Sequence, residues 1–202
     1  MIYVYFDKLA NIIAQANIAQ DNLQKSQIKS MLFSHRHQIL SQFCSQNHLP
    51  VPVYAKQSHG KPVVTNSPLA FNQSHSDDDY ALVYSLSVQR LGVDIEGVHR
   101  QANFEPLARR FFHADEYALW QASGCDRVLW FKIWTIKEAV LKASGLGIRM
   151  PLRELNAQFA SERQGEVVHE KIGRYRFECV MVGECVLTVA YEGCVQAWQF
   201  VK

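Results

Sequence analysis

Two acidic residues, Asp94 and Glu96, are spaced for shared chemistry in the segment GVDIE. Side chains alternate across a β-strand, so Val93 and Ile95 can face a core while both carboxylates lie on the opposite face. Carboxylates this close repel each other unless a proton or a cation neutralises them. Oxygen ligands in this layout suit Mg²⁺, with Mn²⁺ as a substitute. The ordinary alternative is a strand end that carries two solvated acids.

A second charged pair, Glu138 and Lys142, lies four residues apart in the segment WTIKEAVLK. At this spacing both side chains project from one helix face, and Trp134 precedes them by one turn in the same column. On a helix surface such an ion pair stabilises the helix by only about 0.2–0.5 kcal/mol. Here the acid lies beside an apolar stripe, where an unpaired charge is costly. A third metal ligand and a lysine that binds phosphate would account for both residues.

Hydrogen-bond donors suited to phosphate are grouped in two further segments. Ser74 and His75 lie in FNQSHS, which we expect to form a loop at a strand end and to offer a phosphate seat. Lys61 lies upstream between Gly60 and Pro62, two residues typical of turns. The ordinary alternatives are a surface histidine and a solvated lysine in a simple turn.

The elements that must position these residues are indicated by hydrophobic periodicity. Strands are expected at residues 2–6, 53–55, 61–65, 69–72, 80–88 and 91–96. Helices are expected at residues 21–46 and 104–144, with a polar loop at residues 97–103. After Gly145 and Gly147, which supply a helix stop, the tail alternates through VQAWQF as in an antiparallel meander. The chain therefore predicts an α+β fold of two similar halves, residues 1–90 and 91–202.

Apolar residues at helical spacing predict which helix faces are buried. In the first helix the stripe consists of Leu32, Phe33, Ile39, Leu40 and Phe43. In the second helical region it consists of Leu129, Ile133, Ile136 and Val140.

Composition excludes several classes of protein. The net charge of +2 gives no strong field for nucleic acid. No run approaches the roughly 18 apolar residues of a membrane-spanning helix, and no cleavable leader is evident, so we expect a cytoplasmic protein without a membrane partner. Five cysteines without a CxxC pair indicate reduced structural thiols rather than disulfides or metal ligands.

Taken in chain order, the polar segments resemble those of the Sfp-type 4′-phosphopantetheinyl transferases. The matching segments are GKP at Gly60–Pro62, FNxSHS at Phe71–Ser76, GVDIE at Gly92–Glu96, RFFxxxE at Arg110–Glu116 and WxxKEAxxK at Trp134–Lys142. The last two segments, with the spacing between them, are specific to this family. All five segments together make the resemblance strong. The resemblance implies a monomer of two halves related by a pseudo-twofold axis, with coenzyme A bound in the cleft between them. It also implies transfer of 4′-phosphopantetheine from coenzyme A to a serine of an acyl or peptidyl carrier protein, with release of adenosine 3′,5′-bisphosphate.

The resemblance also implies a role for each candidate residue. The expected Mg²⁺ ligands are Asp94, Glu96 and Glu138. Lys142 would contact the pyrophosphate, with Lys137 as a weaker candidate. The adenosine and its 3′-phosphate would be held in the first half by Lys61, Ser74, His75 and Arg36. The serine proton would pass to Glu96, Glu138 or Glu116, three acids among which the sequence does not choose.

The second half would carry the metal site and would dock the carrier protein near Phe111, Phe112 and the following helix. One departure from the resemblance concerns Asp77–Asp79, because acids beside a phosphate seat repel the ligand unless they point away. A metal-dependent nuclease is the first rival function, but it would favour a basic groove that a net charge of +2 does not supply. A non-catalytic module that binds coenzyme A or a carrier is the second, and the presence of all three acids with Lys142 argues against it.

Overall fold

The computed structural model describes residues 1–16, 24–76, 78–194 and 198–201. The elements up to residue 90 are β1 (Ile2–Lys8), α1 (Leu9–Gln15), α2 (Lys25–Gln46), β2 (Tyr54–Lys56), β3 (Pro62–Val64), β4 (Ala70–Ser76) and β5 (Asp79–Ser85). Those that follow are β6 (Leu91–Gly97), α3 (Phe104–Phe111), α4 (Ala114–Ala122), α5 (Arg127–Ser144), the 3₁₀ turns η1 (Gly147–Arg149) and η2 (Leu152–Glu154), β7 (Ala157–Phe159), β8 (Gln164–His169), β9 (Gly173–Val182), β10 (Cys185–Glu192) and β11 (Trp198–Val201).

Two main sheets repeat one strand order, which confirms the α+β prediction with two halves of similar plan. The first sheet has the order β11-β1-β5-β4 and the second the order β6-β10-β9-β8-β7. In each half the first strand pairs antiparallel with the second strand of a later hairpin, β1 with β5 and β6 with β10. That second strand then pairs antiparallel with its hairpin partner, β4 or β9.

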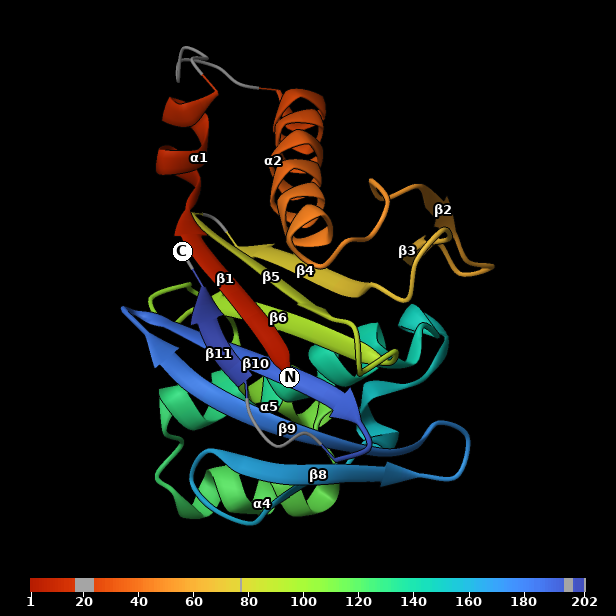
Figure 1. Cartoon of the computed structure of the whole chain (residues 1–202). Coiled ribbons are helices and arrows are strands. Elements are labelled where there is room, and N and C mark those ends of the chain that lie inside the picture. Colours follow the sequence, from red (N-terminus) through yellow and green to blue (C-terminus); the bar gives the residue numbers. More distant parts are fainter. Residues whose placement is uncertain (17–23, 77, 195–197, 202) are drawn as a thin grey trace.

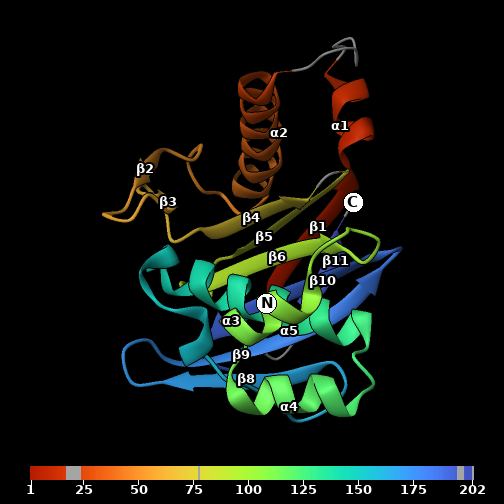
Figure 2. The same cartoon turned by 180° about the vertical axis from the view of Figure 1, so that it is seen from behind.

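The two sheets stack face to face between helices. In Figures 1 and 2, α2 stands on the outer side of the first sheet with α1 beside it, while α3, α4 and α5 cover the outer side of the second. The apolar layer between the sheets includes Val93 and Ile95 of β6, as their alternation predicts. Asp94 and Glu96 are therefore directed away from this layer. Among the described residues, no helix is long and apolar enough to span a bilayer.

The tail and the segment FNQSHS differ from the sequence-based expectation, and α1 was not expected. The tail does form an antiparallel meander from β7 to β10, but β11 leaves it and pairs in parallel with β1, matching Ile2 with Trp198. Alternation predicts a strand without naming its partner, and β1 offers a free edge beside an apolar cluster that Trp198 joins. The expected loop at Ser74 and His75 is instead the end of β4, where these residues pair with Ala81 and Tyr80 of β5.

The central helix of the second half, α5, packs against β6 with almost no space between them. A Cβ atom added to Gly92 would lie 2.1 Å from the carbonyl oxygen of Ala139 and 2.6 Å from the amide nitrogen of Ala143. Glycine is therefore required at this position of β6. The helix ends at Gly145, whose φ of 77° is the left-handed C-cap that the sequence predicts.

Candidate active site

The acidic strand β6 is fastened along its edge to β4 by side chains at alternating positions. Asn72 Oδ1 accepts from the Val93 amide (3.0 Å), Ser74 Oγ donates to Asp94 Oδ1 (2.8 Å), and Ser76 Oγ donates to Glu96 Oε2 (2.9 Å). Because β4 belongs to the first sheet and β6 to the second, these bonds join the two halves at the acids. The segment FNQSHS thus orients the carboxylates, a role that its sequence did not indicate.

Lys142 of α5 reaches the same junction. Its Nζ lies 2.7 Å from Asp94 Oδ1 and also donates to Ser74 Oγ at 2.8 Å and to the Val93 carbonyl at 3.2 Å. The other oxygen of Asp94, Oδ2, is buried and has no hydrogen-bond partner among the described residues. A buried carboxylate oxygen without a partner is costly unless a ligand completes it. This oxygen is the open position of the site.

Glu138 lies one helical turn before Lys142 and is half-buried. Burial raises the pKa of its carboxyl group above the ordinary value, and the negative charges of Asp94 and Glu96 raise it further, against the opposing effect of Lys142. The three acids predicted to act together therefore share one electrostatic neighbourhood. A cation placed among them would relieve this repulsion.

As the side chains stand, basic residues partly neutralise these acids. Lys142 is bonded to Asp94, and Arg100 Nη1 donates to both oxygens of Glu96 at 2.7 and 2.8 Å. Within the described part of the chain, no three His, Cys, Asp or Glu side chains converge as a ready-made metal cluster. The donor set nevertheless fits a hard cation, because it consists of carboxylate oxygens and includes the unpartnered Oδ2 of Asp94.

Lys61 bridges β6 and the end of α5. Its Nζ donates to the carbonyl oxygens of Leu91 (3.3 Å) and Ala143 (3.0 Å). Burial, and then the charge of Arg90, lowers the pKa of Lys61 to about 8. Both cations line a cavity of about 360 Å³ that also reaches Ser144. Among the described residues, the hydrogen bonds of Lys61 thus go to backbone carbonyls beside this cavity rather than to Ser74 or the acids.

His75 is exposed on β4. Desolvation lowers its pKa, and the positive charges of Lys142 and Lys29 act in the same direction. The imidazole therefore lies in a positive environment that extends from α5 to α2.

Arg36 of α2 is buried in an aromatic box. Its guanidinium carbon lies 5.0, 5.1 and 4.9 Å from the ring centroids of Phe33, Tyr54 and Phe71. Its Nε has no hydrogen-bond partner, and no ion pair with a carboxylate is found for it within the described residues. Phe33 was expected in the buried stripe of α2, but it is 47% exposed and stacks on Arg36 instead. Sequence reasoning missed this box because its rings come from three separate elements.

Glu116 and Lys137 form an ion pair inside the second half. Lys137 Nζ lies 2.6 Å from Glu116 Oε2, and the side chains are 0% and 1% exposed. Because Lys137 is fully buried, it does not reach a ligand at the acids. Glu116 also accepts from the amides of His113 and Ala157, each at 2.7 Å. Burial raises the pKa of Glu116 and lowers that of Lys137.

Of the acids that follow FNQSHS, Asp79 is held inside the fold rather than at the proposed phosphate seat. Asp79 is buried, pairs with Lys8 at 2.7 Å and accepts from Cys185 Sγ at 3.0 Å. Asp78 is exposed, and Asp77 lies outside the described residues. Repulsion of a phosphate by Asp79 is therefore not expected.

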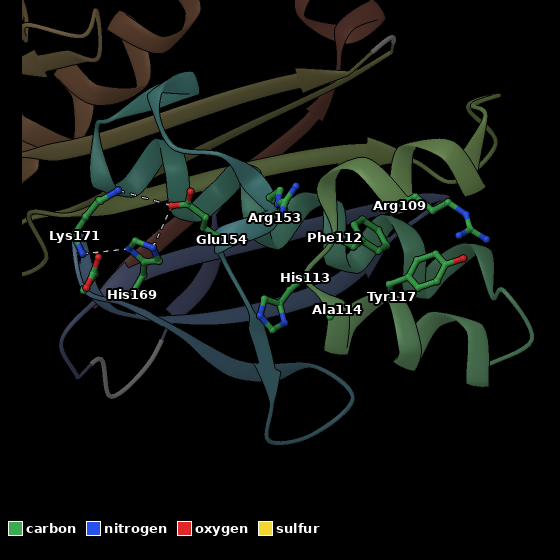
Figure 3. Close-up of a pocket in the computed structure, with 10 residues that line it drawn as sticks. Arg109, Phe112, His113, Ala114, Tyr117, Arg153, Glu154, His169 and Lys171 are labelled. Atoms are coloured by element: carbon green, nitrogen blue, oxygen red, sulfur yellow. Dashed lines mark hydrogen bonds and ion pairs between the residues drawn. The ribbon is translucent and has the colours of Figure 1, made fainter.

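A second, larger cavity of about 900 Å³ lies between the α3–α4 corner and the β8–β9 turn (Figure 3). Its lining includes Arg109, Phe112, His113, Tyr117, Arg153 and Lys171. The β8–β9 side of the sheet is the side away from β6, so this cavity is separate from the acids. Phe111, by contrast, packs on Trp134 with ring centroids 5.7 Å apart.

Comparison with known proteins gives one consistent result. The sequence model of the 4′-phosphopantetheinyl transferase superfamily matches residues 90–190. Asp94, Glu96, Glu116, Glu138 and Lys142 lie inside that range, whereas Arg36, Lys61, Ser74 and His75 lie outside it.

Individual curated relatives match just under half of the chain. The 4′-phosphopantetheinyl transferase AcpT of Escherichia coli O157:H7 is 41% identical over 48% of this chain and 50% of its own length. The 4′-phosphopantetheinyl transferase HetI of Nostoc is 38% identical over 46% of this chain and 41% of its own length. The chain thus matches half or less of these two curated relatives. A solved holo-[acyl-carrier-protein] synthase of Thermotoga maritima is 19% identical over 51% of this chain and 62% of its own, with a TM-score of 0.43.

Proposed function

Because the chain belongs to the 4′-phosphopantetheinyl transferase superfamily, we propose that it transfers 4′-phosphopantetheine from coenzyme A to a serine of an acyl or peptidyl carrier protein. Adenosine 3′,5′-bisphosphate is the other product. The observation that carries the proposal is the junction of β4, β6 and α5, where three acids share one neighbourhood beside Lys142 and Asp94 Oδ2 has no partner.

Asp94, Glu96 and Glu138 would hold Mg²⁺ or Mn²⁺ at this junction. When bound, such a cation supplies positive charge to a pyrophosphate and neutralises the three acids. Lys142 adds a second positive charge beside them, where the leaving group gains negative charge during transfer. In the metal-bound state Lys142 would exchange its bond to Asp94 for one to the pyrophosphate.

The first half, residues 1–90, would bind the adenosine end of coenzyme A, and residues 91–202 would hold the metal and dock the carrier. Support for the first assignment comes from Arg36, a buried cation with an unmade N–H bond. The positive surroundings of His75 and the cavity beside Lys61 add to it. A phosphate would satisfy the donors that these residues leave open. The protein would act as a cytoplasmic monomer.

The serine proton is assigned to Glu138 rather than to Glu116. A general base must lie within hydrogen-bond reach of the proton that it accepts. Glu116 is buried, and its oxygens already accept from three donors inside the protein. Glu138 is half-buried, so its carboxyl group is open to an incoming hydroxyl as that of Glu116 is not. Glu96 is the remaining alternative, although Arg100 and Ser76 occupy its oxygens.

The proposal is tested by incubating the protein with coenzyme A, Mg²⁺ and an apo-carrier protein and measuring adenosine 3′,5′-bisphosphate by chromatography. Release is expected only when the carrier retains its acceptor serine. A carrier with that serine changed to alanine is the matched control. Equal release with both carriers would show hydrolysis of coenzyme A instead of transfer.

Replacing Lys142 by alanine is expected to lower the transfer rate by about 10²–10³-fold, because a cation beside the developing charge is lost. Lys132→Ala on the same helix is the matched control, since among the described residues Lys132 Nζ donates to the Glu162 carbonyl, at 2.9 Å, away from the acids. The sequence suggests Lys137→Ala as the comparison, but that change would strand buried Glu116 and destabilise the fold by about 3–5 kcal/mol. Similar initial rates for the Lys142 and Lys132 variants would show that Lys142 has no role in the transfer reaction.

The affinity for coenzyme A is expected to fall as the pH rises through about 8, the lowered pKa of Lys61. The sign follows from the side chain, because a lysine carries its charge below its pKa and loses it above. In Lys61→Met, KM for coenzyme A should already be high at neutral pH and should stay constant across that range. Measuring KM from neutral to alkaline pH in both proteins checks this. A wild-type KM that does not change with pH would contradict the phosphate role of Lys61.

A further inference from the structure

The buried pair Glu116–Lys137 has no direct part in the proposed reaction, yet it lies next to the residues that do. Lys137 immediately precedes Glu138 on α5. We infer that this pair is a positioning unit, which fixes the rotation of α5 about its axis so that Glu138 faces Asp94 and Glu96. The inference rests on the proposed function of that site.

Every polar atom of the pair is directed to a fixed point of the fold. Lys137 Nζ contacts Glu116 and donates to the carbonyl oxygens of Leu152 (2.8 Å) and Leu155. Glu116 in turn accepts from the amides of His113, the N-cap of α4, and Ala157, in β7. One side chain of α5 is thereby tied to the start of α4 and to the segment that leads from η2 into β7.

The attraction between the two charges does not by itself explain why a charged pair lies here. Removing two charges from water is costly, and a well-packed apolar pair of similar volume is often as stable or more so. What an ion pair with directed hydrogen bonds supplies, and an apolar pair does not, is a fixed direction.

Most of the surface of α5 is apolar and enclosed, and hydrophobic contacts are not directional. Directed bonds such as that of Thr135 Oγ1 with Thr188 Oγ1 (2.7 Å) and those of Lys137 add a preferred rotation. The buried residues of α5 are Trp130, Phe131, Ile133, Thr135, Ile136, Lys137, Ala139, Val140, Leu141 and Ala143. The less enclosed column at four-residue spacing consists of Trp134, Glu138 and Lys142. Rotation of the helix would move this column away from β6.

A small rotation is enough to matter. A carboxylate about 6 Å from the helix axis moves about 1 Å when the helix turns by about 10°. Misplacement by about 1 Å can cost about 10²-fold in rate. The close contact at Gly92 sets how near α5 lies to β6. The three bonds of Lys137, together with the Thr135–Thr188 bond, set the rotation of α5 at that distance.

The test replaces both members by methionine, Glu116→Met with Lys137→Met, so that no buried charge is left alone. Circular dichroism and thermal unfolding report the fold, electron paramagnetic resonance reports Mn²⁺ affinity, and steady-state kinetics report kcat and KM for coenzyme A. Lys132→Met is the matched control on the same helix, because Lys132 also donates to a backbone carbonyl.

The double variant is expected to stay folded but to unfold below the wild-type midpoint, because the amides of His113 and Ala157 and the carbonyls of Leu152 and Leu155 lose their partners. Its Mn²⁺ affinity and its kcat should each fall by about 10–100-fold, as when other outer partners of metal ligands are removed. KM for coenzyme A should change less than kcat, since the proposed adenosine site belongs to the first half. A folded double variant with wild-type Mn²⁺ affinity and kcat would overturn the inference and leave the pair as a stabilising contact.

If the double variant does not fold, Lys137→Arg carries the test. Arginine keeps the charge but its planar fork cannot repeat the three bonds of a lysine, so weaker Mn²⁺ binding supports positioning and unchanged binding overturns it. The Mn²⁺ measurement uses neither coenzyme A nor a carrier. Failure of the proposed reaction would therefore appear as wild-type protein that binds Mn²⁺ without transfer, separately from failure of the positioning inference.

Discussion

Replacing Glu138 by glutamine is expected to lower the transfer rate by about 10²–10⁴-fold, the range for loss of a positioned acid–base group. The same change is expected to leave the metal-free protein as stable as the wild type, or more stable. Burial and the charges of Asp94 and Glu96 raise the pKa of Glu138, so its ionised form is disfavoured in the folded state. Glutamine keeps the shape and removes that charge.

The sign of the stability change can be worked out from linkage. An acid whose pKa is raised by folding lowers stability as the pH rises from the unfolded pKa through the folded one, and the penalty is complete above it. At neutral pH Glu138→Gln removes this penalty, and at acid pH the two proteins should be equally stable. Added Mg²⁺ should reverse the order, because a bound cation stabilises the folded wild type and the variant binds it less well.

Thermal unfolding with and without Mg²⁺, beside the transfer rate, checks this prediction. Asp94→Asn is a less clean variant, because Asp94 is buried and bonded to Lys142 and Ser74. A metal-free Glu138→Gln protein that unfolds well below the wild type would count against the electrostatic account. So would a Mg²⁺-dependent stabilisation equal to that of the wild type.

Gly92→Ala adds a single methyl group to the site and is expected to displace α5 from β6. The added Cβ would meet backbone atoms of α5, at 2.1 Å from the Ala139 carbonyl oxygen, so no side-chain rotation can relieve the contact. The helix must move, and overpacking of this kind costs about 1–3 kcal/mol or more. Because α5 carries Glu138 and Lys142, a shift of about 1 Å should also lower the transfer rate by about 10²-fold.

Gly97→Ala is the matched control for that substitution. Gly97 ends the same strand, and a Cβ added to it would meet nothing within 4 Å. Its effect on the free energy of unfolding should stay within about 0.5 kcal/mol. Urea denaturation and transfer rates of both variants give the comparison. Equal stability of the two would show that α5 and β6 are not in the close contact described above.

Much of this fold could be predicted because strand alternation and helix spacing depend on residues that are close in the sequence. The alternation of β6 placed Val93 and Ile95 in the core and left Asp94 and Glu96 on the other face. The spacing of Glu138 and Lys142 placed both on one side of α5, which now lies against β6. Family resemblance, rather than periodicity, pointed to Arg36.

The features that the sequence did not predict depend on partners far along the chain. The parallel pairing of β11 with β1 joins the two ends of the described chain, and no local pattern specifies it. The bonds from Ser74 to Asp94 and from Lys137 to Glu116 depend in the same way on how the sheets and helices dock. Ser74 and His75 looked like a loop because polar residues fill the end of β4, yet their pairing with β5 makes them a strand.

We propose that the acids where β4, β6 and α5 meet serve a metal-dependent transfer from coenzyme A to a carrier protein. This can be decided by intact-mass spectrometry of an apo-carrier incubated with this protein, coenzyme A and Mg²⁺. We expect a mass gain of one phosphopantetheine on the carrier serine, abolished by a chelator and restored by added Mg²⁺. A carrier panel that stays at its apo mass with folded protein, or a gain that persists without divalent cations, would contradict it.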